Sequence, residues 1–532
     1  MQSEFIEYVY LILIILGLVM LANKLNIASP ILLVVGGLAV SFIPIFSHVT
    51  ISPELVFFIF LPPLLYEASW QISWKEFWKF RRVISSFAFP IVIITSCVVA
   101  VVSNTIIPGF TLALGFLLGG IVSPPDAIAA TTIMRQAKAP KTLLSIAEGE
   151  SLLNDASSLI VFRFALAAII TGQFDLKEAS FSFFIVVLMG IAIGLLVGFI
   201  FYCIHRWLPV TASIEIVLTI VTPYCMYYSA EHFHFSGVLA VVSGGLFLSS
   251  KRLSMLNYMS RIQGVNVWNS IVFVLNGFVF LLIGLQLPSI VQQLGDVSLM
   301  TAIWYGLIIS FVLIITRIAT TLGSSAFTIF ISRFITVAES NPGWIMPLVF
   351  GWAGIRGVVS LAAALSIPLL LSDGEAFPHR NLILFITFVV ILVTLVLQGL
   401  TLPWLIRKLS VKSDQANSEL DQEKILQKKI TQYSINQIEK ILNKKGFQNE
   451  HLSNLQSKLK TEMVYFNREL EETGDTNQNA RKEFKKIYLD LLDQQRKLLN
   501  DINQHSEYDE DIIRKYQFLI DMEEYKVRGK SV

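Results

Sequence analysis

Long apolar runs follow one another along most of this chain, and they constrain its fold more than any other feature of the sequence. A helix of about 20 apolar residues crosses the ~30 Å hydrocarbon core of a membrane. Short polar breaks separate such runs here. We predict about thirteen transmembrane helices, at residues 5–22, 28–46, 51–69, 83–102, 111–133, 143–170, 181–203, 212–230, 236–250, 265–287, 299–328, 341–371 and 381–406. The chain is therefore expected to be an all-α polytopic membrane protein.

The charged residues are distributed unevenly, and their distribution predicts two domains. Only 15% of the chain is charged, whereas soluble domains carry about 25%. Of the 80 Lys, Arg, Asp and Glu residues, 45 lie in the last 126 residues, after Ile406. We therefore expect a transmembrane domain over 1–410 and a charged, helical domain over 411–532. The mixed charges of this tail argue against binding to nucleic acid.

The loop charges predict how the chain is oriented in the membrane. Cytoplasmic loops of membrane proteins collect Lys and Arg. With the N-terminus outside, the inward loops hold fifteen basic residues, and the outward loops hold two, Lys177 and Arg380. An odd number of spans then places the tail in the cytoplasm. We predict a multi-pass protein of the cell membrane with an outside N-terminus and a cytoplasmic C-terminal tail.

Several ionisable residues lie inside the predicted spans, where each costs several kcal/mol unless it is paired or hydrated. They are Glu67, Asp126, Glu150, Asp155, Arg163, Arg317 and Arg356. One interpretation is that they form structural ion pairs between helices. Acids that cluster beside helix-breaking residues favour ion transport instead.

The fifth predicted span carries such a break. Pro124 and Pro125 stand at its centre and Asp126 follows them. Proline has no backbone N–H and clashes with the preceding turn, so a straight helix cannot pass here. Irregular backbone at membrane depth is tolerated only where it lines a cavity or is covered by protein. An acid at this break predicts an ion site.

The twelfth predicted span holds a second weak point, with glycines at 351, 354 and 357 around Arg356. Spans 5 and 12 are an odd number of spans apart, so they cross the membrane in opposite directions. If spans 1 to 6 and spans 8 to 13 form two halves, the interrupted helices occupy corresponding places. This arrangement predicts two inverted repeats with crossed discontinuous helices and a site near the midplane.

The sixth predicted span supplies oxygen ligands. Ser151 and Asp155 are four residues apart and share a helix face, as do Glu150 and Asn154. A hard cation such as Na⁺ prefers oxygen, so Asp155, Ser151, Asp126 and the carbonyls freed by the break could bind it. Burial raises the pKa of a carboxylate, so that one such group can hold either a proton or a cation.

Four stretches of the chain carry a more specific pattern. They read EGESLLNDASS at 148–158, SPPDAIAATT at 123–132, FLPPLLYEAS at 60–69 and GIRGVVSLAAAL at 354–365. Together they resemble the monovalent cation:proton antiporter family. Within it they look like the bacterial type of the electroneutral sodium/proton exchanger branch, which has an Asn-Asp pair where the electrogenic branch has two aspartates. The likeness covers roughly residues 1–410.

The resemblance implies roles for the polar residues of the site. Asp155 would be the carboxylate that binds the cation and the proton, and Asn154 would help to hold the unwound part of span 5. Ser151 and Asp126 would coordinate the ion or support its ligands. Glu67 would lie at the cytoplasmic side of the funnel.

The resemblance also implies two supporting arrangements and shows one departure. Glu150 would pair with Arg317 between mobile core helices, and Arg356 would stabilise the crossing of spans 5 and 12. The family usually has Thr immediately before the aspartate of span 5, and this chain has Pro125 there. Only the backbone carbonyl of Pro125 can serve as a ligand.

The expected function is secondary antiport of Na⁺, or Li⁺, for H⁺ by alternating access, with a role in pH and sodium homeostasis. The cation and the proton would compete for the buried aspartate. We expect a homodimer embedded in membrane lipid, with no enzymatic activity and no cofactor besides the transported ions.

Other functions stay open at this point. K⁺/H⁺ exchange is the alternative within the antiporters. An ion channel would need a continuous pore, and a receptor that signals through the tail would not need acids at a helix break. Two opposed broken helices with a buried aspartate fit alternating access better than either.

Overall fold

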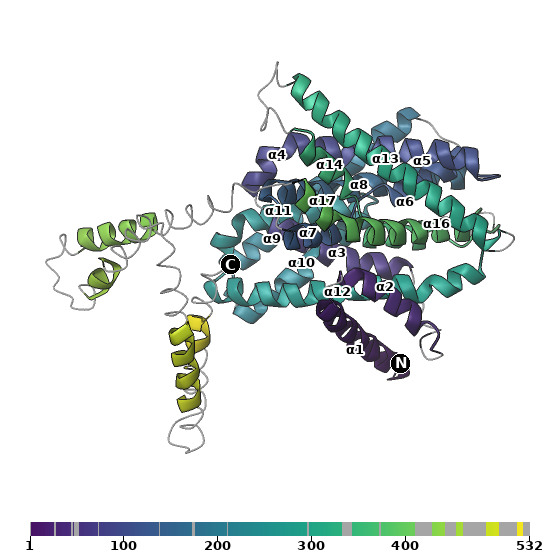
Figure 1. Ribbon diagram of the computed structural model, residues 1–532. Helices are drawn as coiled ribbons and strands as arrows, with labels where there is room; N and C mark the ends of the chain where they lie inside the picture. The colour runs from purple at the N-terminus through teal and green to yellow at the C-terminus, as the bar shows by residue number, and fades with distance from the viewer. Residues whose placement is uncertain are drawn as a thin grey trace. The chain divides into compact units, whose positions relative to one another are not determined.

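A computed structural model describes most of the chain (Figure 1). The described residues are 2–25, 28–43, 46, 53–72, 74–137, 139–172, 176–209, 211–294, 297–331, 343–371, 374–409, 428–441, 454–460, 486–499, 516 and 519–524. The chain divides into two compact units, Met1–Ser413 and Asp414–Val532. Within the described part of the second unit, helical residues lie at 428–441, 454–460, 486–499 and 519–524, and Ile435, Ile438 and Leu492 are buried.

All of the named elements in the described part of the first unit are helices, as the sequence predicts. The first eight α-helices are α1 (Gln2–Leu25), α2 (Ser29–Val40), α3 (Pro53–Gln71), α4 (Trp74–Ser86), α5 (Val92–Ile106), α6 (Leu112–Val122), α7 (Ala127–Gln136) and α8 (Lys141–Thr171). The next are α9 (Leu176–Trp207), α10 (Ala212–His232), α11 (Gly237–Met255), α12 (Tyr258–Gln292), α13 (Leu299–Ile331), α14 (Ile345–Trp352), α15 (Val358–Leu365), α16 (Arg380–Val393) and α17 (Gly399–Lys408). Two π-helical turns, η1 (Phe87–Ile91) and η2 (Thr394–Gln398), join α4 to α5 and α16 to α17.

Every predicted span falls on a helix or on consecutive helices, but several boundaries differ. Helix α2 ends at Val40, well before residue 46, whereas α12 begins at Tyr258, seven residues before the predicted start. The described helices include seven that are long and apolar enough to cross a membrane on their own. The protein is therefore a polytopic helical membrane protein, and the total of about thirteen spans stays a prediction.

Both predicted breaks interrupt their helices. Residues 123–126 separate α6 from α7, and residues 353–357 separate α14 from α15. The two breaks contact each other, because the backbone N–H of Asp126 donates to the carbonyl of Ile355 over 2.6 Å. Gly357 is required at this contact, since a Cβ there would lie 1.8 Å from Oδ2 of Asp126.

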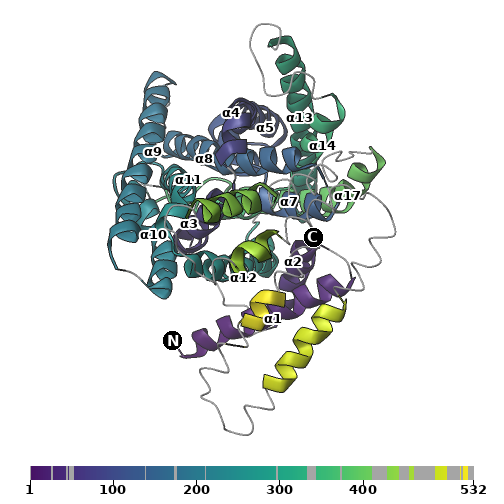
Figure 2. The same ribbon diagram turned by 90° about the vertical axis from the view of Figure 1, so that its left-hand side faces the viewer.

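Glycines let several helices pack with their backbones in contact, as small residues do between membrane helices. On α9, Gly190, Gly194 and Gly198 recur every four residues and face α11. A Cβ at Gly194 would lie 2.1 Å from the carbonyl oxygen of Ala240. Helix α8 lies inside the bundle and contacts both α6 and α11 (Figures 1 and 2).

Candidate ion-binding site

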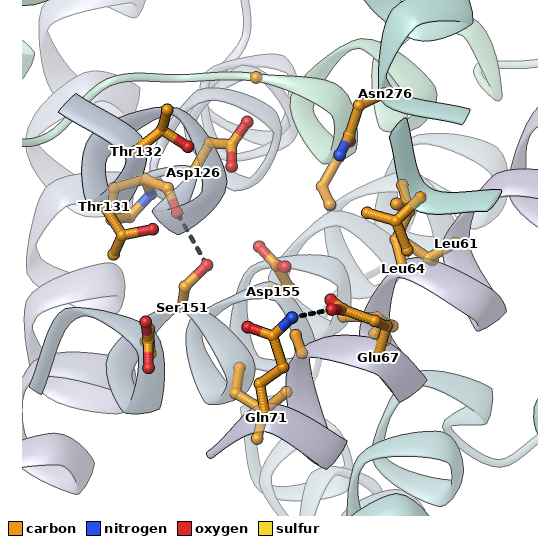
Figure 3. Close-up of a pocket in the computed structure, with 18 of the residues that line it drawn as sticks. Leu61, Leu64, Glu67, Gln71, Asp126, Thr131, Thr132, Ser151, Asp155 and Asn276 are labelled. Carbon is orange, nitrogen blue, oxygen red and sulfur yellow. Dashed lines mark hydrogen bonds between the residues drawn. The ribbon is translucent and has the colours of Figure 1, made fainter. Parts of the chain in front are cut away.

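A cavity of about 310 Å³ lies where the α6–α7 break meets α8. Figure 3 shows the side chains around it. Its polar lining comes from α3, α7, α8, α12, α15 and the two breaks, and consists of Glu67, Gln71, Asp126, Thr131, Thr132, Arg135, Glu148, Ser151, Asp155, Asn269, Asn276 and Ser360. The cavity thus brings together acids and neutral oxygens that are up to about 290 residues apart in the sequence.

Asp155 lies on α8 and projects into this cavity (Figure 3). Only 7% of the residue is exposed. Asp126 lines the same cavity from the break, immediately before the first residue of α7. The unpaired N–H groups of a helix N-terminus favour a negative charge, so α7 stabilises a carboxylate at this position. Asp155 and Asp126 therefore share one cavity.

The break at Pro124 and Pro125 places a backbone oxygen beside the polar side chains of α8. Ser151 Oγ and Asn154 Nδ2 each lie 3.4 Å from the carbonyl oxygen of Pro125 and donate to it. Asn154 is fully buried, and its amide ties α8 to the irregular segment. Ser151, which lines the cavity, lies one helical turn before Asp155.

Arg356 lies in the α14–α15 break and holds the end of α6. Its Nε donates to the carbonyl of Val122 over 3.0 Å, and Nη2 donates to that of Ser123 over 3.5 Å. These carbonyls end α6 and have no intrahelical partner. A cation at a helix C-terminus is also favoured by the helix dipole. Arg356, which is 1% exposed, therefore links the two breaks.

Glu150 and Arg317 form a buried pair between α8 and α13. Arg317 Nη1 and Nη2 donate to the two carboxylate oxygens over 2.9 and 2.7 Å. The guanidinium also lies over the Phe350 ring, 5.4 Å from its centroid. Glu150 and Arg317 do not line the cavity that Asp155 lines, so the pair supports α8 from outside that cavity.

Glu67 lines the opposite wall of the cavity, on α3, and Gln71 donates to its carboxylate. A neighbouring cavity of about 320 Å³ is lined by Glu67, Gln71 and Asn269 as well. These three residues therefore lie where the two cavities adjoin.

Arg163 lies elsewhere. It pairs with Glu231 of α10 at 2.6 Å and lines a separate cavity of about 330 Å³. No role was predicted for Arg163 from the sequence. Its partner, Glu231, is 68 residues away in the chain.

Several polar residues of the main cavity were not predicted from the sequence, among them Asn276 and Ser360. Neutral polar side chains in apolar helices commonly bond to their own backbone, so they give no strong signal. The spacing of Asn269 and Asn276, which are seven residues apart and lie on one face of α12, could have indicated a polar lining.

These features define a class: a helical membrane protein in which two broken helices meet beside a cavity that contains buried acids. The chain belongs to the family described as "Sodium/hydrogen exchanger, transmembrane", whose profile matches residues 10–408. The resemblance seen in the four sequence stretches is thereby confirmed at the level of the family.

Curated relatives support this membership. The chain is 34% identical over 427 residues to a "Sodium, potassium, lithium and rubidium/H(+) antiporter" of Bacillus pumilus, covering 77% of this chain and 62% of that protein. It is 32% identical to the "Low-affinity Na(+)/H(+) antiporter NhaS1" of Synechocystis, covering 73% and 71%. The alignment thus spans only about three fifths of the Bacillus relative.

A solved structure shares the fold. The sodium proton antiporter MjNhaP1 from Methanocaldococcus jannaschii, determined at pH 8, superposes with a TM-score of 0.61 and is 17% identical. The match covers 77% of this chain and all of that one. At this identity the likeness shows the fold alone.

Proposed function

We propose that this protein is a secondary antiporter that exchanges Na⁺, or Li⁺, for H⁺ across the cell membrane. The observation that carries the proposal is Asp155, a buried acid that shares a cavity with Asp126 at a broken helix. Such an intramembrane acid marks an ion or proton pathway. The names of the relatives from Bacillus and Synechocystis support the same activity.

The exchange follows from competition for one carboxylate. A cation bound by Asp155, with oxygens from Ser151, Asp126 and the Pro125 carbonyl around it, leaves no room for a proton on that carboxylate. A proton on Asp155 removes the charge that holds the cation. If the site opens to one side of the membrane at a time, each cation that leaves is replaced by a proton.

The geometry suits a site that moves as a unit. Asp126, Asp155 and Pro125 belong to the segments that Arg356 and Asn154 tie together. Glu67 and Asn276 belong to α3 and α12, on the facing walls. Alternating access would move the segments that carry Asp126 and Asp155 past α3 and α12. Glu67 would then lie at the cytoplasmic entrance of the cavity. We place the N-terminus outside, the tail in the cytoplasm and a second copy beside the first as a homodimer.

Substitution of the central acid tests this proposal. In proteoliposomes, a Na⁺ gradient should move protons in the unmodified protein, and Asp155→Asn should abolish that movement, because the variant cannot release a proton or offer a charge. Internal pH reported by a fluorescent dye is the measurement. Na⁺-driven proton movement in correctly inserted Asp155→Asn liposomes would refute the mechanism.

K⁺/H⁺ exchange is the second candidate. It is supported by the name of the Bacillus relative, which includes potassium beside sodium, and Pro125 removes one side-chain oxygen by which the site could select its cation. The same liposome assay with Na⁺, Li⁺ and K⁺ gradients separates the candidates. A role in pH and sodium homeostasis follows if Na⁺ drives the larger rate.

A further inference from the structure

Two oxygens in the wall of the main cavity lack a hydrogen-bond partner among the described residues. They are Oγ of Ser360, a residue with 2% exposure, and Oδ1 of Asn276. A buried polar atom without a partner costs free energy, so native proteins keep few of them. Each such atom therefore needs an explanation, and one explanation is a ligand that binds there and dissociates again.

The positions of the two residues place them on different walls. Ser360 lies in the first turn of α15, directly after the break that carries Arg356. Asn276 lies on the face of α12 that also presents Asn269 to the cavity. In Figure 3, Asn276 lies across the cavity from Ser151. The two residues therefore line the cavity from sides that α8 does not supply.

The oxygens proposed above leave a cation short of ligands. Hard cations are commonly surrounded by about six oxygens or more. Asp155, Asp126 and Ser151 contribute side chains, but residue 125 is proline and contributes only its carbonyl. That carbonyl already accepts from Ser151 and Asn154. Further neutral oxygens are needed to replace the hydration shell.

We propose that Ser360 Oγ and Asn276 Oδ1 are ligands of the transported cation and determine its selection among Na⁺, Li⁺ and K⁺. The inference rests on the proposed antiport. Both oxygens are neutral, so they contribute to cation binding and leave the charge of the Asp155 carboxylate unchanged. Their removal weakens the cation side of the competition and spares the proton side.

The test is the cation concentration that gives half-maximal exchange, measured for Na⁺, Li⁺ and K⁺ in proteoliposomes. Ser360→Ala removes the hydroxyl with little change in volume, and Asn276→Leu replaces the amide by an apolar group with the same branching. We expect each to raise the half-maximal Na⁺ concentration by about tenfold, with the maximal rate retained. The three cations should be affected unequally, because they differ in size and in the number of ligands that fit.

Matched variants separate coordination from structural damage. Ser360→Thr keeps the hydroxyl, so its half-maximal Na⁺ concentration should stay within about twofold of that of the unmodified protein. Ser310→Ala removes another buried serine, on α13, whose hydroxyl donates to the Gly306 carbonyl over 2.7 Å. Ser310 lies outside the cavity lining, so its loss should leave the half-maximal concentrations of all three cations unchanged.

Cation-dependent thermal stabilisation in detergent measures binding without transport, because a ligand of the native state stabilises it. If the unmodified protein is stabilised by Na⁺ but exchanges nothing, the proposed function fails, and the shift in half-maximal stabilisation still tests Ser360 and Asn276. Unchanged half-maximal concentrations in both variants, for all three cations and by both measurements, would overturn the inference. An unmodified protein that none of the cations stabilises would overturn it as well.

Discussion

Two ion pairs on α8 have nearly the same separation between charges and very different surroundings. Glu150 and Arg317 lie 2.7 Å apart, and their side chains are 2% and 4% exposed. Arg163 and Glu231 lie 2.6 Å apart, with 28% of the glutamate side chain and 43% of the arginine side chain exposed. The distance between charges therefore says little about what each pair contributes.

The environment decides the difference. In the interior, both charges have lost their hydration, and each depends on the other for compensation. Removing one partner leaves the other buried and uncompensated. At a partly exposed position, water or lipid headgroups can replace a lost partner, so the pair contributes little.

The largest effect is therefore expected at the buried pair. Glu150→Gln and Arg317→Ala should each lower the free energy of unfolding by about 3–5 kcal/mol, because each strands one charge inside the bundle. Thermal unfolding in detergent measures the loss. The matched control is Arg135→Gln, which breaks the exposed pair between Arg135 and Glu148 at the start of α8.

The double variant tests whether the two residues act through each other. If Glu150 and Arg317 neutralise one another, the double variant should recover part of the loss, since neither charge is then stranded. Strictly additive losses would mean that the two side chains act independently. Arg356 would then be the preferred partner of Glu150.

A much smaller effect is expected at the exposed pair. Arg163→Gln should lower the free energy of unfolding by about 0.2–1 kcal/mol, and the difference should shrink as salt is added. Unfolding at low and at high ionic strength is the measurement. A loss above about 2 kcal/mol would show that lipid shields the Arg163–Glu231 pair from water, so that it behaves like the buried one.

The smallest effect on exchange is expected from removal of the tail. A chain that ends near Lys412 keeps every acid that is buried in the described part of the structure, so it should insert, dimerise and exchange Na⁺ for H⁺. Its maximal rate or its dependence on pH is the quantity that the tail could alter. Exchange rates against pH, at matched protein density in liposomes, test this. A correctly inserted truncation that is inactive at every pH would make the tail part of the transport machinery.

The sequence located the two breaks because their residues cannot continue a helix. Pro124 and Pro125 remove backbone donors, and the glycines around Arg356 weaken the second helix. Buried acids were recognisable for a similar reason, since a charge within an apolar run is rare. The ends of α4 and α12 were harder to predict. Helix α4 is amphipathic and α12 begins with several polar residues, so a search for apolar runs passes over the starts of both.

Apart from the Glu150–Arg317 pair, which the family resemblance implies and the structure contains, the partners of the polar groups could not be read from the sequence. Arg163 meets Glu231 only because α8 and α10 adjoin in space. Ser360 and Asn276 resemble many other neutral residues of membrane helices, and only the position of the cavity distinguishes them. The π-helical turn at Phe87–Ile91 includes Pro90, but a proline does not specify which distortion it causes.

The glycines of α9 have a mechanical consequence. With Gly194 against Ala240, the backbones of α9 and α11 come into direct contact, so a displacement at that point cannot be absorbed by a change of side-chain rotamer. Such a contact is stiff, and the two helices should translate and rotate together as one rigid body. The interface between α8 and α10 is compliant by contrast, because it contains the long side chains of Arg163 and Glu231. Any relative motion within the bundle is therefore expected at α8, while α9 and α11 stay fixed with respect to each other.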